Sequence, residues 1–531
     1  MRKRLFSPRG SQWPRYRTPP RVLRPTPWPR VGATWKPSIS WHPRASSPKT
    51  GCEARPGRRR RPRPAGDTLR LPSTSGIGTL LAGLTLTLGC ARTDAPLHRP
   101  DIILITADTL RADHLGAYGY GRDTSPNFDA FSDDALLFEN AFSHAPQTHT
   151  SFSSILTGFL PHETHAYQRA PLPAEVDTLA ELLQSAGYST HAVVSNYLLR
   201  QKSRWREGQG WAQGFDSYDD EMNQRELIRP QPERTARETT DRAIEIIRRS
   251  TDKPLFLWVH YQDPHGPYAA PPEFAAAVGA APEEHRLLPL NRTRSGAGGI
   301  PVHQRLPGGR NYFHYVWQYD GEIRYFDHQL GRLISALKEA GLYDQSLILF
   351  TADHGEALGE HDFYFSHVGR LFHGLTHVPL VLKHGGRLSG RRQDYVQHLD
   401  VVPTLAIAAG IEPDPRLRGT DLRQPTPEGR EIFAIVESPL DRDGERASLV
   451  VDGLKLVKNR DTQKLRLYDL RADPAEENDL SGDPSHRTQR KQLEHRLERL
   501  RHADRLALGA PQPEPLTDQE REALRALGYL D

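Results

Sequence analysis

The stretch DIILITADTLRADHLGAYGY, residues 101–120, decides the fold of this chain. Its apolar, β-branched run from Ile102 to Ile105 predicts a short strand that is buried on both faces. Asp108 follows closely. A carboxylate just past the carboxyl end of such a strand lies where open parallel sheets place their ligands. The stretch therefore predicts a parallel sheet with a binding site at the end of this strand.

A second stretch, SLILFTADHGEALGEH at residues 346–361, repeats this arrangement. Its strand candidate is followed closely by Asp353 and His354. Taken alone, either Asp353 or Asp108 could simply cap the turn that follows its strand. Because both strands end in Thr-Ala-Asp, the two stretches together instead indicate one metal ion that is bound by residues from both strands.

The stretch HAPQTHTSFSSILTG, residues 144–158, supplies a hydroxyl group at the start of a helix. Thr148 is a cap-type residue, and Phe152, Ile155 and Leu156 return after it at helical spacing. Unpaired backbone N–H groups and the helix dipole can hold a tetrahedral anion at such a position. A lone threonine here would be an ordinary N-cap, but beside the two Asp-bearing stretches Thr148 is predicted to belong to an active site.

From residue 100 to about residue 410, strand and helix candidates alternate, as in a parallel sheet with helices on both faces. The strand candidates are Ile102–Thr106, His191–Ser195, Leu255–His260, Leu347–Thr351 and Val378–Leu382, and the helix candidates are Asp177–Ala186, Arg234–Arg249 and Tyr315–Ala340. Residues 279–311 lack an apolar period and predict a mobile surface loop. Further on, we expect strands at Ala447–Val451, Leu454–Lys458 and Leu465–Tyr468, then a charged helix at about 485–503.

With these motifs the chain resembles the sulfatase family of the alkaline-phosphatase superfamily. The resemblance runs from residue 101 to 158 and continues, in the family's order, through residues 319–356, 377–383, 398–411, 467–480 and 524–530. It implies an α/β fold: an alkaline-phosphatase-like three-layer α/β/α domain with a mainly parallel central sheet at 97–410, and a smaller C-terminal α+β subdomain at 411–531. It also implies a metal-dependent hydrolase of sulfuric or phosphoric esters.

The chain departs from the family at the residue that sulfatases oxidise to formylglycine. Their signature has the form C/S-x-P-x-R-x-x-x-x-T-G, and counting back from residues 157–158 places Thr148 first and Phe152 at the arginine position. Because that oxidation needs a primary alcohol or thiol carbon, we expect no formylglycine. Related branches, including nucleotide phosphodiesterases and phosphoethanolamine transferases, resemble this chain in using an unmodified threonine, whose hydroxyl attacks phosphorus directly.

The resemblance also bears on the metal. Calcium sulfatases have two adjacent acids at the first strand, whereas here Thr109 follows Asp108. The remaining ligand set is Asp108, Thr148, Asp353 and His354. Calcium favours about six to eight oxygen ligands, while an imidazole and a low ligand number suit zinc or manganese. We therefore expect one divalent metal ion, zinc or manganese ahead of calcium or magnesium.

Three further site residues follow from the resemblance. His265, in LFLWVHYQDPHGPY at 255–268, matches the family's histidine that faces the ester oxygen. His367 matches, by its spacing from residues 353–354, the histidine beside the leaving group, with His373 as the weaker alternative. Because the arginine of the signature is absent, Lys383 is the candidate for binding the substrate anion.

Other polar residues near these motifs are predicted to be structural. His260 and Asp263 lie nearer to their strand than His265 does. The loop DPAEEND, residues 473–479, is acidic enough to suggest a metal site, but a solvated turn explains it as well.

The N-terminal segment differs in composition from the rest of the chain. Residues 1–70 hold 19 Lys and Arg residues against two acids and show no apolar period, which predicts disorder or a start assigned too far upstream. The run at 58–61 could instead be a nucleic-acid patch. Without this segment the charge is −13 rather than +4, so we expect an acidic enzyme with no nucleic-acid partner.

Residues 71–90 predict export. Their apolar run, 77–88, has the length of a signal-peptide core, is too short to span a bilayer and ends at Gly89-Cys90. This resembles a bacterial lipoprotein signal in which Cys90 is the lipidated first residue, with a buried helix as the alternative. We expect a periplasmic, membrane-anchored or secreted protein.

Three functions remain open. In the first, Thr148 attacks a phosphate monoester or diester, and water or an acceptor alcohol resolves the phosphothreonine. In the second, the chain hydrolyses sulfate esters without formylglycine. In the third, it binds anions or glycans without catalysis. The expected substrate is a small molecule, a glycan or a lipid-headgroup ester.

Overall fold

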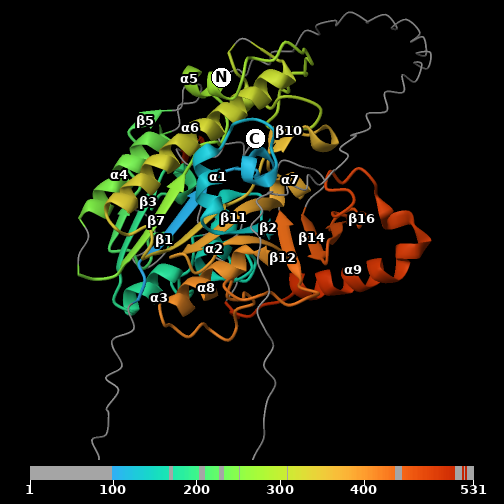
Figure 1. Ribbon diagram of the computed structural model, residues 1–531. Helices are drawn as coiled ribbons and strands as arrows, with labels where there is room; N and C mark the ends of the chain where they lie inside the picture. The colour runs from blue at the N-terminus through green and yellow to red at the C-terminus, as the bar shows by residue number, and fades with distance from the viewer. Residues whose placement is uncertain are drawn as a thin grey trace, which may run out of the picture. The chain divides into compact units, whose positions relative to one another are not determined.

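The computed structural model describes residues 99–166, 171–201, 210–225, 232–249, 252–307, 309–436 and 445–508, with a few positions between 517 and 525. They belong to one compact unit that begins at Arg92 (Figure 1). The predicted N-terminal segment and the signal-like residues 71–90 lie outside the described part. Of the helices in the described part, none has both the length and the hydropathy needed to cross a bilayer.

An eight-stranded sheet forms the middle layer, in the order β12-β2-β11-β8-β1-β7-β3-β4. Its strands are β1 Ile102–Ala107, β2 Leu136–Phe142, β3 Ser189–Val194, β4 Ser217–Asp219, β7 Leu255–Tyr261, β8 Leu347–Ala352, β11 His377–His384 and β12 Gly390–Gln397. Neighbouring strands pair in parallel, except that β11 is antiparallel to both β2 and β8. The predicted mainly parallel sheet is confirmed.

The three central strands place the predicted site. β1 lies between β7 and β8, and Thr106 is opposite both His260 and Thr351. All three strands are fully buried, as expected for apolar runs in a parallel sheet covered on both faces. Because the strands are in register, the residues that follow them emerge at one edge of the sheet.

Helices cover the sheet in two groups (Figure 1). One group contains α1 Pro126–Asp133, α4 Ala236–Arg248, α5 Pro272–Ala277 and α6 Tyr312–Glu339, and the other contains α2 Thr148–Thr157, α3 Leu179–Ser185 and α8 Val401–Ala408. α3 begins with a reciprocal capping box between Thr178 and Glu181. α2 ends at Gly158, whose φ of +75° suits the left-handed position that closes a helix. The three predicted helices are confirmed: α3 and α4 are slightly shorter than predicted, and α6 begins three residues earlier and ends one residue earlier.

Short elements complete the main domain. The described part contains β5 Gln224–Arg225, β6 Pro232–Glu233, β9 Ala357–Leu358, β10 Tyr364–Ser366 and the one-turn helix α7 His373–Thr376. Residues 279–311 carry only isolated bridges, such as Leu290 with Ile300, and one 3-10 turn. The absence of regular structure predicted there agrees with the structure, and its mobility stays a prediction.

A second, antiparallel sheet follows the main domain. Its order is β13-β14-β15-β16, formed by Ile432–Val436, Arg446–Val451, Leu454–Asn459 and Leu465–Asp469. Helix α9, Arg487–Arg501, packs on it through Leu493, Leu497 and Leu500. The predicted C-terminal α+β part is therefore present.

Candidate active site

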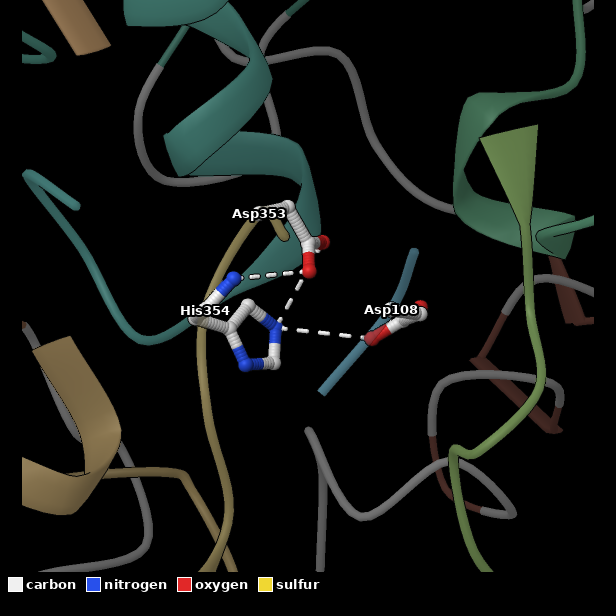
Figure 2. Close-up of side chains that lie close together, drawn as sticks. All are labelled: Asp108, Asp353 and His354. Carbon is white, nitrogen blue, oxygen red and sulfur yellow. Dashed lines mark hydrogen bonds and ion pairs between the residues drawn. The ribbon is translucent and has the colours of Figure 1, made fainter. Parts of the chain in front are cut away.

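Asp108, Asp353 and His354 meet at the carboxyl edge of the central strands (Figure 2). The His354 Nε2 atom lies 3.7 Å from Asp108 Oδ1 and 3.6 Å from Asp353 Oδ2. The backbone N–H of His354 also donates to Asp353 Oδ1 at 2.7 Å. All three side chains are fully buried. The two strand–TAD stretches thus converge as the sequence predicted.

The electrostatics of this cluster fit a divalent cation. Burial and the charge of Asp353 raise the pKa of Asp108, burial raises the pKa of Asp353 to about 8, and burial lowers the pKa of His354 well below its usual value. Asp108 Oδ1 and Asp353 Oδ2 have no hydrogen-bond partner. Two buried carboxylate oxygens without partners and a neutral imidazole are costly alone, and a cation would satisfy all three.

Thr148 joins the cluster from the start of helix α2. Its Oγ1 atom lies 3.4 Å from Asp108 Oδ2 and 3.4 Å from His354 Nε2. The first helical hydrogen bond of α2 runs from Ser151 N–H to the Gln147 carbonyl, so the preceding backbone N–H groups have no acceptor within the helix. The Thr148 hydroxyl and the backbone N–H groups that can bind an anion therefore lie together at the start of α2.

A row of imidazoles extends from the cluster. The ring centroids of His354 and His367 are 4.6 Å apart, and those of His367 and His265 are 5.4 Å apart. His265 Nδ1 lies 2.7 Å from the Gly266 carbonyl oxygen, so this nitrogen carries the proton in that hydrogen bond. Its Nε2 is then the nitrogen that carries no proton in this tautomer. The structure thus brings both predicted histidines next to the cluster.

Glu356 is a site residue that the sequence prediction missed. It is fully buried, and its Oε1 lies 3.3 Å from His367 Nδ1. Its Oε2 accepts a hydrogen bond from the Tyr268 hydroxyl at 3.0 Å. Glu356 therefore orients His367, and its place in the TADHGE motif was the signal that could have identified it.

His260 was predicted to be structural, but its ring faces the cluster. Its Nε2 lies 3.9 Å from Asp108 Oδ2 without a hydrogen bond, while Nδ1 lies 3.0 Å from Thr106 Oγ1. Burial lowers the pKa of His260 to about 3, so the imidazole is neutral. On the other side, the Asn196 side-chain amide donates to Asp108 Oδ2.

Thr109 occupies the position of the second acid of calcium sulfatases in an unusual backbone conformation. Its φ is +54°, which is rare for a β-branched residue and costs about 1–3 kcal/mol. Its N–H donates to Asp353 Oδ1 at 3.3 Å, and its carbonyl accepts from the Tyr319 hydroxyl at 2.7 Å. The strained residue thus offers a backbone donor where those relatives offer a carboxylate.

Phe152, at the signature's arginine position, brings no charge to the site. It is fully buried, with its ring centroid 5.0 Å from that of Trp258 and 4.8 Å from that of His260. The weaker candidate His373 stacks on His377 at 4.6 Å and packs near Phe142 instead of the cluster.

The assignment of Lys383 to substrate binding requires correction. Lys383 is buried on β11 opposite Ile348, near the start of β8, about 16 Å of strand away from Asp353. Its Nζ pairs with Asp134 at 2.9 Å and Asp344 at 3.4 Å. Lys383 is therefore a structural residue at the opposite edge of the sheet.

Comparison with known proteins identifies the family of this chain. A family model described as Sulfatase matches residues 100–411, and one described as N-sulphoglucosamine sulphohydrolase, C-terminal, matches residues 359–503. The chain is 27% identical to iduronate 2-sulfatase of Homo sapiens over 429 residues, covering 65% of this chain and 76% of that protein. It is 26% identical to choline-sulfatase of Rhizobium meliloti (strain 1021) over 447 residues, covering 73% of this chain and 83% of that protein.

Solved structures confirm the fold class. The phosphonate monoester hydrolase of Agrobacterium radiobacter matches with a TM-score of 0.61 and 23% identity, over 76% of this chain and 95% of that chain. BT4656 in complex with its substrate D-glucosamine-2-N,6-O-disulfate matches with a TM-score of 0.63 and 18% identity, over 77% of this chain and 100% of that chain. Such identities establish the fold alone. Because the Sulfatase model spans more than half of the chain, the chain belongs to the sulfatase family.

Proposed function

We propose that the chain is a metal-dependent hydrolase in which Thr148 is the covalent nucleophile and phosphate esters are better substrates than sulfate esters. The observation that carries this proposal is the position of the Thr148 hydroxyl, 3.4 Å from both Asp108 Oδ2 and His354 Nε2. The relatives include sulfatases and phosphonate monoester hydrolases, so both substrate classes lie within the family's range.

The residues of the site suffice for a two-step displacement. A divalent cation held by Asp108, Asp353 and His354 would neutralise the ester's charge and lower the pKa of a nearby hydroxyl. The Thr148 hydroxyl releases its proton to solvent, and its oxygen forms a bond to phosphorus as the bond to the alcohol oxygen breaks. His367 or His265 gives the leaving alcohol oxygen a proton. Backbone N–H groups at the start of α2 stabilise the phosphoryl oxygens.

The second step releases the phosphoryl group from Thr148. Water gives a proton to an adjacent histidine as its oxygen attacks phosphorus, the bond to the threonine oxygen breaks, and the histidine passes a proton to that oxygen. An acceptor alcohol in place of water would give transfer in place of hydrolysis. Formylglycine acts as a hydrated aldehyde, a gem-diol, from which sulfate can leave by elimination. An unmodified threonine has no second hydroxyl for this elimination, so a sulfate adduct on Thr148 would be released slowly. For this reason we expect phosphate esters to be better substrates than sulfate esters.

Sulfate-ester hydrolysis without formylglycine is the second candidate, supported by the named activities of the sulfatase relatives. In that case, water attacks sulfur directly or Thr148 serves as a slow nucleophile. The substrate in either case is a small-molecule, glycan or lipid-headgroup ester. A non-catalytic, anion-binding role is the third candidate.

A matched substrate panel separates these candidates. The purified full-length protein, loaded with zinc or manganese, is assayed on nitrophenyl sulfate, nitrophenyl phosphate and bis-nitrophenyl phosphate. We expect one of the phosphate esters to have a kcat/KM at least about 100-fold above that of the sulfate. The reverse order would favour the sulfatase, and no turnover of any ester with bound metal would favour the non-catalytic role.

Glu356 provides a test of the leaving-group histidine. In Glu356→Gln the carboxylate that faces His367 Nδ1 becomes a neutral amide, so we expect kcat to fall about 10- to 100-fold, as for other groups that orient a catalytic imidazole. Glu360→Gln is the control, because Glu360 binds Arg111 at 2.6 Å and contacts no histidine of the site. Equal losses in both variants would remove the role of Glu356.

We also propose that the chain is exported and held at a bacterial membrane by a lipid on Cys90. In cells expressing full-length protein, Cys90→Ser is expected to move the enzyme from the membrane fraction to the soluble periplasmic or secreted fraction. Mass spectrometry of the mature N-terminus identifies the lipid. Wild-type protein found in the cytoplasm with an unmodified Cys90 would contradict both parts of this proposal.

A further inference from the structure

The two oxygens of Asp108 have different surroundings. Oδ2 accepts a hydrogen bond from the Asn196 side-chain amide, and the Thr148 hydroxyl lies 3.4 Å from the same oxygen. Oδ1 has no hydrogen-bond partner among the described residues and lies 3.7 Å from His354 Nε2. Asp353 Oδ2 is likewise unpartnered there, so a cation between the two carboxylates would meet Asp108 at Oδ1. The contacts at Oδ2 therefore decide where Oδ1 is aimed.

The amide group of Asn196 has a fixed orientation. Asn196 is buried, and its Oδ1 accepts a hydrogen bond from the Leu198 N–H at 2.7 Å, which caps the 3-10 turn Tyr197–Leu199. An asparagine side chain offers one oxygen that accepts and one NH₂ group that donates. Since the oxygen is bound at the turn, the NH₂ group is the one that faces Asp108.

Ser195 fixes the backbone that carries Asn196. Its hydroxyl donates to the His260 carbonyl at 2.7 Å and accepts from the Gln262 N–H at 2.7 Å. Both of these backbone groups lie at the end of β7, the strand between β3 and β1. The end of β3 is therefore fastened to the end of β7, and Asn196 reaches Asp108 across β7 from a fixed position.

We propose that Asn196 is a positioning residue of the metal site, whose amide holds Asp108 Oδ2 and so keeps Oδ1 directed at the cation. Groups that hold a ligand carboxylate in this way raise the affinity of a site for its metal. Asn196 thus acts through Asp108 and is not itself a catalytic residue. The inference rests on the proposed metal dependence, but not on whether the ester is a phosphate or a sulfate.

Two replacements separate the donor from the cap. Asn196→Ser keeps an oxygen that can accept from the Leu198 N–H but lacks the amide that reaches Asp108, and Asn196→Ala lacks both groups. The full-length proteins are freed of metal by dialysis against a chelator, and the Kd for zinc and for manganese is measured by competition with a chelating dye. We expect both variants to bind each metal about 10- to 100-fold more weakly than the wild type.

Asn127→Ser is the matched control. The Asn127 amide donates to the buried carboxylate of Asp327 at 2.7 Å, so this variant removes the same kind of contact outside the cluster. It should bind metal as the wild type does. Wild-type affinity in Asn196→Ser would show that Asn196 only caps its turn, and an equal loss in Asn127→Ser would show a general effect on the fold. Either result would overturn the inference.

Excess metal gives the second readout. Because Asn196 acts through metal affinity, kcat of Asn196→Ser at saturating metal should return to within about threefold of the wild type. A kcat that stays low at full metal occupancy would place Asn196 in the reaction itself and overturn the positioning role. A wild type that binds no metal would overturn the proposed function together with this inference. A wild type that binds metal in an Asn196-dependent way but turns over no ester would overturn only the proposed function.

Discussion

Replacing Thr148 by alanine is expected to lower kcat by roughly 10⁴-fold or more on the best ester of the panel. Thr148 is the only hydroxyl shown in contact with both Asp108 and His354 in the described part of the chain. Its loss leaves the site without the atom that attacks the ester. Thr148→Ser keeps that oxygen at the start of α2 and should retain much of the activity.

A quenched reaction gives the direct evidence. Mass spectrometry should find a phosphoryl group on the peptide that contains Thr148 in the wild type and none in Thr148→Ala. Thr150→Ala is the matched control, since it removes a hydroxyl from the same helical turn without changing the nucleophile. Efficient ester turnover that survives Thr148→Ala would mean that water attacks directly.

Much of the fold could be predicted because the central strands are uninterrupted apolar runs. β1, β7 and β8 are buried on both faces, so their composition alone identifies them. β12 was missed because its sequence GRRQDYVQ is that of a partly exposed edge strand. In β2, Glu139 and Asn140 interrupt the apolar run, and they are the half-exposed residues of that strand. Pairing with β11 and β12, not composition, makes β2 a strand.

The site was predictable where residues follow parallel strands, and not elsewhere. Asp108, Asp353 and His354 emerge at one edge because β1 and β8 run in the same direction. Lys383 was misplaced because β11 runs the opposite way, so the end of β11 lies at the other edge of the sheet. No local pattern in HVPLVLK reveals this direction.

Long-range packing sets contacts of two residues that the local sequence does not reveal. The structural role of His260 stays a prediction; the pairing of β7 with β1 sets its Nδ1 3.0 Å from Thr106 Oγ1 and its Nε2 3.9 Å from Asp108 Oδ2. The DPAEEND loop is a turn with mostly exposed residues, as predicted, but its Glu476 is buried and paired with Lys455. Neither contact depends on residues that are close in sequence.

Replacing Asp353 by asparagine is expected to reduce bound metal from about one ion per chain to nearly none, and activity by roughly 10³-fold or more. Asparagine keeps the oxygen that accepts from the His354 and Thr109 N–H groups, so the local backbone should persist. Asp108→Asn should behave alike, because each variant removes one of two carboxylates from a shared site. Metal content is measured by mass spectrometry after dialysis with zinc, manganese or calcium. Asp461→Asn, an exposed loop position, is the control.

The pH dependence of stability distinguishes this metal loss from misfolding. Since burial raises the pKa of Asp353 to about 8, the metal-free folded state binds more protons than the unfolded chain between about pH 4 and pH 8. Metal-free wild type should therefore lose stability as the pH rises through this window.

Metal needs the ionised carboxylates, so the gain in Tm on loading should be larger at pH 8 than at pH 6, by several degrees. Metal-free Asp353→Asn has one fewer buried acid to ionise and should lose less stability over the same range. Full metal occupancy in Asp353→Asn, or a loading gain that does not change with pH, would show that the ion is not held by these carboxylates.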